Sequence, residues 1–161
     1  EEWMHFIHKE IQGRYVLVYQ IHNNPILDRY AMKFAKHVGL PLYRVSPSLH
    51  QIMRGGKFIF LPDVGEFLSY INNATYIVTD SFHGTAFSIN FNKQFIEILP
   101  NTKTGSRNQS ILQLTGLQDR IVTDYNDFSI ATKMIDYTFV NGIIKEERKK
   151  SYCILKRIIE E

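Results

Sequence analysis

The sequence alternates short, mostly apolar runs with segments whose apolar residues recur at helical spacing, and this alternation constrains the fold more than any other feature. The runs lack the polar alternation of a half-exposed strand, so they predict strands buried on both faces, as in parallel sheets. We expect these strands at residues 14–21, 41–45, 58–61, 75–79 and 94–99. Helical patterns lie between them, at residues 25–39, 62–73 and 85–91. The alternation predicts an open α/β domain with a mainly parallel sheet and flanking helices.

The segments outside this core also have predictable structure. A short helix is expected to open the chain and end at Gly13, residues 46–57 form an irregular connection, and a helical segment at 109–117 follows a polar loop at 101–107. From Asp136, apolar positions make one helical stripe, so residues 137–160 predict a terminal helix that packs back on the domain. Residues 1–161, with 44% hydrophobic content, can build the core of a single domain.

Charge and composition narrow the function. The formal charge of +3 is spread along the chain without a dense Lys/Arg block, so no nucleic-acid partner is predicted. The single Cys153 cannot form an internal disulfide, which fits a reducing compartment. No run reaches the roughly 18 apolar residues of a membrane span, and the start lacks a signal-peptide pattern. We therefore expect a cytoplasmic protein, which could act at the inner face of the membrane. The absence of an initial Met suggests that an upstream segment has been removed.

The turn that leaves the strand at 75–79 carries the densest group of reactive side chains. It reads Asp80-Ser81-Phe82-His83-Gly84-Thr85. In an open α/β sheet, ligands bind beyond the carboxyl ends of the strands. If Asp80 or Ser81 caps the following helix, the first amides of that helix have no intrahelical partner and point into the crevice. The turn therefore predicts an anion-binding site.

The side chains of this turn suggest how an anion would be held. Gly84 leaves room for a phosphate or carboxylate near the backbone, and Ser81 and Thr85 offer hydroxyl donors. His83 adds a charge and a transferable proton near neutral pH. Asp80 would repel an anion, so we expect it to cap the turn or to orient the imidazole of His83. Each of these residues also has an ordinary explanation, as a helix cap or a solvated side chain.

Candidates outside the turn are Arg107 and His22. Arg107 follows Gly105-Ser106 and could bind a carboxylate or phosphate through its forked guanidinium, although an ordinary surface arginine explains it equally well. His22 stands at the exit of the first strand and, in a parallel sheet, reaches the same crevice rim as His83. The histidines do not combine with Cys or Asp into a credible ligand set, so we predict no metal site.

Several segments resemble the core signature of the polysaccharide pyruvyl transferase family. The strongest are Phe67-Leu-Ser-Tyr-Ile-Asn-Asn-Ala74, Tyr76-Ile-Val-Thr-Asp-Ser-Phe-His-Gly-Thr-Ala-Phe-Ser88 and Phe91-Asn92-Lys93. Later residues look like that family's later pattern: Ser106-Arg107, Gly116-Leu117, and Asp136-Tyr137 with Arg148, Ser151 and Leu155. Residues 15–19 are similar to its first donor-domain strand. The resemblance covers nearly the whole chain, at the level of the family's C-terminal half.

This resemblance implies an architecture, a reaction and a site. Family members have two α/β halves facing each other across a cleft, as in glycosyltransferases of the GT-B type, so this chain is expected to be the Rossmann-like, donor-binding half without its N-terminal acceptor half. Members transfer pyruvate from phosphoenolpyruvate onto sugar hydroxyls of bacterial surface polysaccharides, forming a ketal. His83 matches the family's site histidine, expected to act as general acid or to hold the donor phosphate. Several members carry an arginine where this chain has Ser81, and Arg107 could replace that charge.

The resulting hypothesis names the partners. Phosphoenolpyruvate would be held by helix-start amides, Ser81, Gly84, Thr85 and Arg107, without a metal or other cofactor. The acceptor would be a glycan or lipid-linked sugar, and the isolated chain is expected not to catalyse transfer because the acceptor half is missing. The alternatives are the nucleotide-sugar-binding half of a glycosyltransferase and a non-catalytic interaction domain on the same fold.

Overall fold

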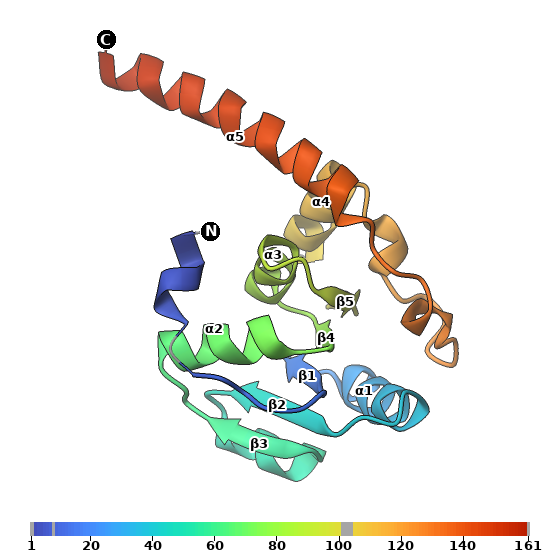
Figure 1. Ribbon diagram of the computed structural model, residues 1–161. Coiled ribbons are helices and arrows are strands. Elements are labelled where there is room, and N and C mark those ends of the chain that lie inside the picture. The colour runs from blue at the N-terminus through green and yellow to red at the C-terminus, as the bar shows by residue number, and fades with distance from the viewer. Residues whose placement is uncertain (1, 8, 101–104, 161) are drawn as a thin grey trace.

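The computed structural model describes residues 2–7, 9–100 and 105–160, and its centre is a five-stranded sheet in the order β3-β2-β1-β4-β5 (Figure 1). All neighbouring strands are parallel. They are β1 (Val16–Tyr19), β2 (Leu42–Ser46), β3 (Lys57–Phe60), β4 (Tyr76–Thr79) and β5 (Gln94–Glu97). Tyr19 is in register with Val45 and Thr79, so the central strands end together, at what we call the carboxyl edge of the sheet. The predicted open parallel α/β fold is confirmed.

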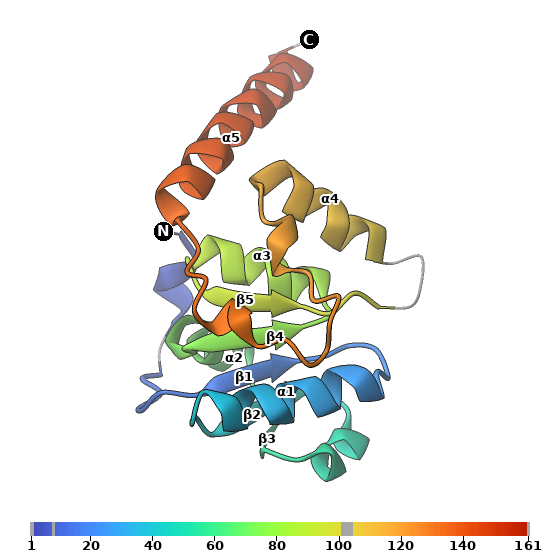
Figure 2. The same cartoon turned by 90° about the vertical axis from the view of Figure 1, so that its right-hand side faces the viewer.

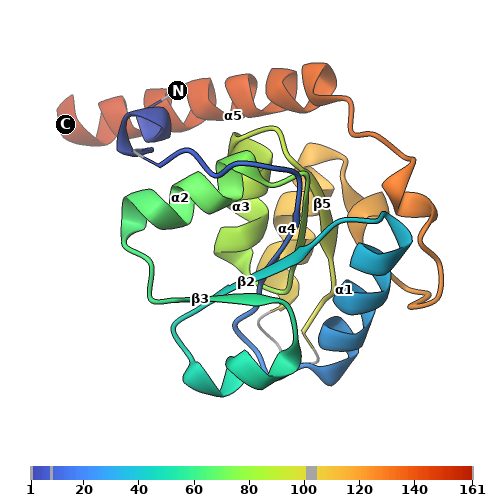
Figure 3. The same cartoon turned by 60° about the horizontal axis from the view of Figure 1, so that its bottom comes forward.

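Helices cover both faces of the sheet, which is why its strands are apolar on both sides (Figures 2 and 3). Helix α1 (Pro25–His37) lies on one face, and α2 (Val64–Asn73) and α3 (Phe82–Asn90) lie on the other. Successive residues of β1 alternate between these layers. Val16 and Val18 belong to the apolar cluster that includes α1, whereas Leu17 belongs to the cluster that includes α2 and α3.

The chain after β5 adds helices beyond α3. Helix α4 (Gly105–Thr115) packs on α3, and the short turns η3 (Gln118–Arg120) and η4 (Ser129–Ala131) lead to α5 (Tyr137–Glu160). Near the start of α5, Val140 is buried and Ile144 half-buried. From Ser151 to Glu160 every side chain is exposed, and this part of α5 projects from the body of the domain (Figures 1 and 2). The predicted packing of this helix on the domain is thus found only in its first half.

The boundaries of other elements also differ from the sequence prediction. The opening helix is a 3-10 turn, η1 (Glu2–Phe6), and does not continue to Gly13, while the expected irregular connection contains another, η2 (Leu49–Arg54). Helix α3 begins at Phe82 rather than Thr85, because Ser81 already caps it. Helix α4 begins at Gly105, within the predicted polar loop, and residues 101–104 of that loop lie outside the described residues.

Candidate functional site

The turn from β4 into α3 is built as the sequence predicts, with Ser81 as the helix cap. Its hydroxyl accepts a hydrogen bond from the Gly84 amide at 3.4 Å, and its own amide donates to Thr79 Oγ1 at 3.0 Å. Burial raises the pKa of the Tyr19 phenol, and its interaction with the same Ser81 side chain opposes that rise. The serine is only 3% exposed. Ser81 therefore holds the turn together, and its hydroxyl is already engaged inside the protein.

Gly84 and Thr85 face the sheet rather than the crevice. A Cβ on Gly84 would lie 2.3 Å from Thr79 Oγ1, so the glycine is needed for the close approach of α3 to β4. Thr85 is fully buried, and its hydroxyl donates to Glu97 Oε2 at 2.6 Å. The sequence suggested that both residues contact an anion. In the structure they instead fix the position of the helix whose first amides point outward.

The carboxylate of Asp80 contacts His22 rather than His83. Its Oδ1 accepts from the Ile21 amide at 2.8 Å and its Oδ2 from the His22 amide at 3.1 Å. The imidazole Nδ1 of His22 lies 3.3 Å from Oδ2. Burial raises the pKa of Asp80, and these contacts oppose the rise. Asp80 therefore orients the loop after β1 and its histidine, which corrects the alternative in which it orients His83.

His83 lies at the carboxyl edge and is exposed to solvent. Its side chain lines an open cavity of about 410 Å³ between the ends of β1 and β2, the start of α2 and the start of α3. The other lining residues are mostly apolar and include Tyr19, Phe67 and Phe87. The volume is in the range of small-molecule sites. The imidazole predicted to carry the chemistry is thus accessible and stands beside a cavity.

Two backbone amides and one guanidinium accompany His83. Within the described residues, the amides of Phe82 and His83 have no hydrogen-bond partner, as expected for the first residues of a helix. Arg107, in the first turn of α4, places its guanidinium 5.3 Å from the centre of the Phe82 ring, and that ring in turn contacts His83. The structure therefore brings Arg107 to the same helix start as His83, with Phe82 between them.

A buried acid, which was not predicted from the sequence, lies beneath this site. Glu97, the last residue of β5, is fully buried and accepts hydrogen bonds from Thr85 and from Asn108 Nδ2, the latter at 2.6 Å. Burial raises its pKa to about 7, with the two hydrogen bonds opposing the rise. Much of its negative charge is therefore absent near neutral pH, which lessens repulsion of an anion above it. A lone acid inside an otherwise apolar strand was the available signal.

Neither a metal centre nor a membrane span is found in the part of the chain that the structure describes. Its His, Cys, Asp and Glu side chains do not come together in groups that could hold an ion. Of its helices, including the long α5, none combines the length and the apolar character needed to cross a bilayer.

The fold and the site define an α/β protein in which a helix start and an accessible histidine lie at the carboxyl edge of a parallel sheet. The family model for polysaccharide pyruvyl transferases matches residues 6–102, which include β1 to β5 and this helix start. The chain belongs to that family.

The search of curated proteins gave no match. Among solved structures, the chain is similar to a protein from Listeria monocytogenes described as a UDP-N-acetylglucosamine 2-epimerase, with 11% sequence identity and a TM-score of 0.49. The aligned region covers 81% of this chain and 48% of that protein, so the chain spans about half of its length.

Proposed function

We propose that this chain binds phosphoenolpyruvate as the donor-binding part of a polysaccharide pyruvyl transferase. The enzyme would transfer pyruvate to sugar hydroxyls of a bacterial surface polysaccharide and form a ketal. Membership of the family supports the class of reaction. The observation that carries the donor assignment is the exposed His83, at a helix start where, among the described residues, the amides of Phe82 and His83 have no partner and beside which Arg107 lies.

The charges of phosphoenolpyruvate suit this arrangement. Its phosphate and carboxylate require clustered donors, and the helix start supplies amides together with the positive end of the helix dipole. Arg107 can bind either group through paired N–H donors and so replaces the arginine for which this chain has Ser81. A protonated His83 would either donate its proton to the methylene carbon or neutralise the departing phosphate.

The remaining partners follow from the reaction. A glycan or a lipid-linked sugar would be the acceptor, and an N-terminal half of the same protein would hold it opposite the carboxyl edge. Such an acceptor places the enzyme in the cytoplasm, at the inner face of the membrane. The donor site requires no metal, because amides and cationic side chains carry the anion.

Calorimetry with the purified chain tests the donor assignment. We expect phosphoenolpyruvate to bind, and His83→Ala to raise its Kd by about 10- to 100-fold, as for the loss of one charge-assisted contact. His37→Ala is the matched control, because His37 is an exposed histidine at the end of α1, away from the carboxyl edge. Failure of phosphoenolpyruvate to bind, or equal affinity for His83→Ala, would contradict the proposal. Binding of UDP-N-acetylglucosamine in its place would favour a glycosyltransferase.

A further inference from the structure

A second large cavity lies at the end of α3 that is remote from His83. It is open, has a volume of about 890 Å³ and lies between η1, the end of α3 and α5, and we call it the α5 cavity. From His83 in the first turn of α3 to Asn90 at its end, the helix rises about 10 Å. The α5 cavity is therefore separate from the candidate site, and it has the size of a ligand site. Its lining residues are Trp3, Asn90, Asn92, Asn141, Ile144, Lys145, Arg148, Lys149 and Tyr152.

Among the described residues, the charged side chains that line the α5 cavity are all basic. They are Lys145, Arg148 and Lys149, on neighbouring turns of α5. Lys149 also pairs with Glu146 at 2.7 Å, but this acid is 60% exposed and is not part of the lining. The lining itself carries an excess of positive charge, which favours an anionic ligand.

The neutral residues of the lining suit a sugar. Three of them are asparagines, whose amides both donate and accept hydrogen bonds, as sugar hydroxyls do. Two are aromatic: Trp3 is 43% exposed and Tyr152 is 68% exposed, so both rings are open to a ligand. An aromatic ring offers a flat apolar surface against which the C–H face of a sugar ring can pack. Together with the cations, these residues fit a glycan that carries negative charge.

The frame of the α5 cavity is held by contacts within the protein. Arg148 Nη2 donates to Asn90 Oδ1 at 2.9 Å, which ties α5 to the end of α3. Trp3 packs edge-on against Phe87 of α3, with ring centroids 5.3 Å apart. Asn92 has a φ of 54°, in the left-handed region, and so turns the chain directly after α3. These contacts place the lining residues before a ligand binds, which lowers the entropic cost of binding.

We propose that the α5 cavity binds an acidic polysaccharide, namely the pyruvylated product of the enzyme. That the acidic group is a pyruvyl ketal rests on the proposed function. A pyruvyl ketal keeps the carboxylate of pyruvate, so each transfer adds a negative charge to the polymer. The cations bind these carboxylates, while the amides and the aromatic rings bind the sugars. A polymer held here stays near the candidate site between transfers, because the second contact raises its effective concentration there.

An anionic membrane would also attract the cations of the α5 cavity. A helix that enters a lipid surface does so with an apolar face. The three asparagines of the lining have no place in such a face, whereas they match the hydroxyls of a glycan. The composition of the lining therefore favours the polysaccharide.

Fluorescence of Trp3 measures binding directly, because Trp3 is the single tryptophan of the chain. The probe is a purified bacterial polysaccharide whose acidic groups are all pyruvyl ketals, compared with the same polymer after hydrolysis of the ketals. We expect the pyruvylated polymer to change the emission of Trp3 and to bind at least about tenfold more tightly than the neutral polymer. Equal affinity for the two polymers, or no binding of either, would refute the inference.

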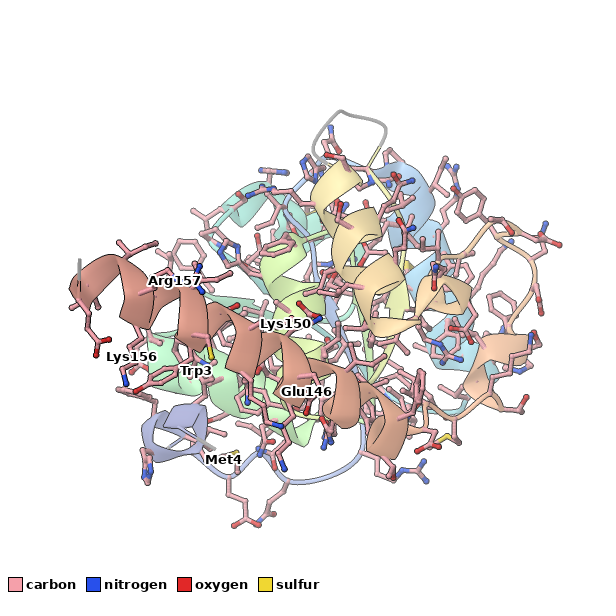
Figure 4. All side chains as sticks on the ribbon, turned by 90° about the horizontal axis from the view of Figure 1, so that it is seen from above. Trp3, Met4, Glu146, Lys150, Lys156 and Arg157 are labelled. Carbon is pink, nitrogen blue, oxygen red and sulfur yellow. The ribbon has the colours of Figure 1, made fainter. Side chains whose placement is uncertain are left out.

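A double variant tests the place of binding. Lys145→Gln with Lys149→Gln removes two exposed cations of the lining and should raise the Kd of the pyruvylated polymer by about 10- to 100-fold. Lys156→Gln with Arg157→Gln is the matched control, because it removes the same charge further along α5, outside the lining (Figure 4). The control should stay within about threefold at about 0.15 M salt, where distant charges are screened. Equal weakening by both double variants would mean unspecific attraction of a polyanion to α5 and would overturn the site.

Two further measurements separate the inference from its alternatives. If vesicles of phosphatidylglycerol bind the chain more tightly than the polymer does, and Lys145→Gln with Lys149→Gln weakens this binding, the α5 cavity belongs to a membrane surface and the inference is wrong. Displacement of the polymer by phosphoenolpyruvate would place the polymer at the candidate site and would also refute it. If phosphoenolpyruvate binds the chain but the polymer does not, the inference fails while the proposed function stands. If the polymer binds but phosphoenolpyruvate does not, the proposed donor site fails while the site for an acidic glycan stands.

Discussion

Gly84 is the residue on which the contact between α3 and β4 depends. A Cβ there would also come within 3.1 Å of the Tyr19 ring, so a larger residue would push the helix away from the sheet. Thr79 cannot yield, because its hydroxyl donates to the Tyr19 carbonyl and accepts from the Ser81 amide. The glycine therefore affects the candidate site indirectly. It sets the depth of α3, and with it the place of the first amides and of His83.

Glu97 should make stability depend on pH. Its pKa is about 7 in the folded protein against 4.5 as the reference, so the folded state binds the proton more tightly. The resulting stabilisation is complete below about pH 4.5 and is lost as the pH rises to about 7, with a size on the order of 3 kcal/mol. We expect Glu97→Gln, which stays neutral, to remove most of this decline. Urea unfolding at several values between pH 5 and 8 measures it.

Asp80, the other buried carboxyl near this site, serves as an internal reference. Burial also raises the pKa of Asp80. Asp80 is present in the natural chain and in Glu97→Gln, so the difference between their free energies of unfolding reports on Glu97 alone. If the free energy of unfolding fell equally with pH in the natural chain and in Glu97→Gln, Glu97 would not be the source of the pH dependence.

At the scale of elements, the sequence predicts each strand and helix where an apolar period is uninterrupted. The helix α1 is an example, because Pro25 marks its start and Leu27, Tyr30 and Phe34 form its buried side. The position of His83 was also predictable, because it depends only on local features. The strand before it and the cap of its helix both lie within a few residues of His83 in the sequence.

Contacts between distant elements could not be predicted in this way. His22 meets Asp80 across 58 residues of chain, and Glu97 meets Asn108 because β5 lies beside β4 and beneath α4. Local periodicity does not determine strand order, so the sequence offered Asp80 only nearby roles, as a cap of the turn or as the residue that orients His83. The buried sides of Gly84 and Thr85 escaped notice for the same reason, because only the packed sheet shows which side of α3 faces inward.

The two halves of α5 should respond differently to mutation. Val140 is buried, so Val140→Ala should lower the free energy of unfolding by about 1–3 kcal/mol through lost burial and a small cavity. Ile158 is 67% exposed, so Ile158→Glu should change it by no more than about 0.5 kcal/mol. Denaturant unfolding of the purified chain measures both. A loss above about 1 kcal/mol for Ile158→Glu would mean that the second half of α5 packs on the domain in solution.

The space beside this exposed half is lined from both ends of the chain. Trp3 of η1 lies toward α5 in Figure 4 and packs edge-on against Phe87. With Ile144 and Tyr152 of α5, it borders a cavity of about 890 Å³. Within the described residues, nothing covers the apolar side chains of α5 that follow Ser151. Periodicity identifies an apolar side of a helix, but it does not tell how far along the helix a covering partner extends.

At the scale of the whole molecule, the candidate site is a surface and not an enclosure. His83 is exposed, Arg107 is exposed on the adjoining helix, and the cavity that His83 lines opens to solvent at the carboxyl edge. Pyruvyl transfer passes through an electrophilic carbon that water would also attack, so an enzyme must close such a site against solvent. In the proposed function, the described residues would bind the donor on one side without covering it, and we therefore propose donor binding, and not catalysis, for this chain by itself.

We therefore expect the 161-residue chain to bind phosphoenolpyruvate without transferring pyruvate. Phosphate release from phosphoenolpyruvate, measured with polysaccharide from the producing organism as acceptor, should stay at the rate without protein, whereas the complete enzyme should release phosphate and form the ketal. The natural chain and His83→Ala should then be equally inactive, although their affinities for the donor differ. If the chain alone formed the ketal and His83→Ala abolished this activity, the prediction would be wrong. The residues of this chain would then exclude water, hold the acceptor and catalyse the whole reaction.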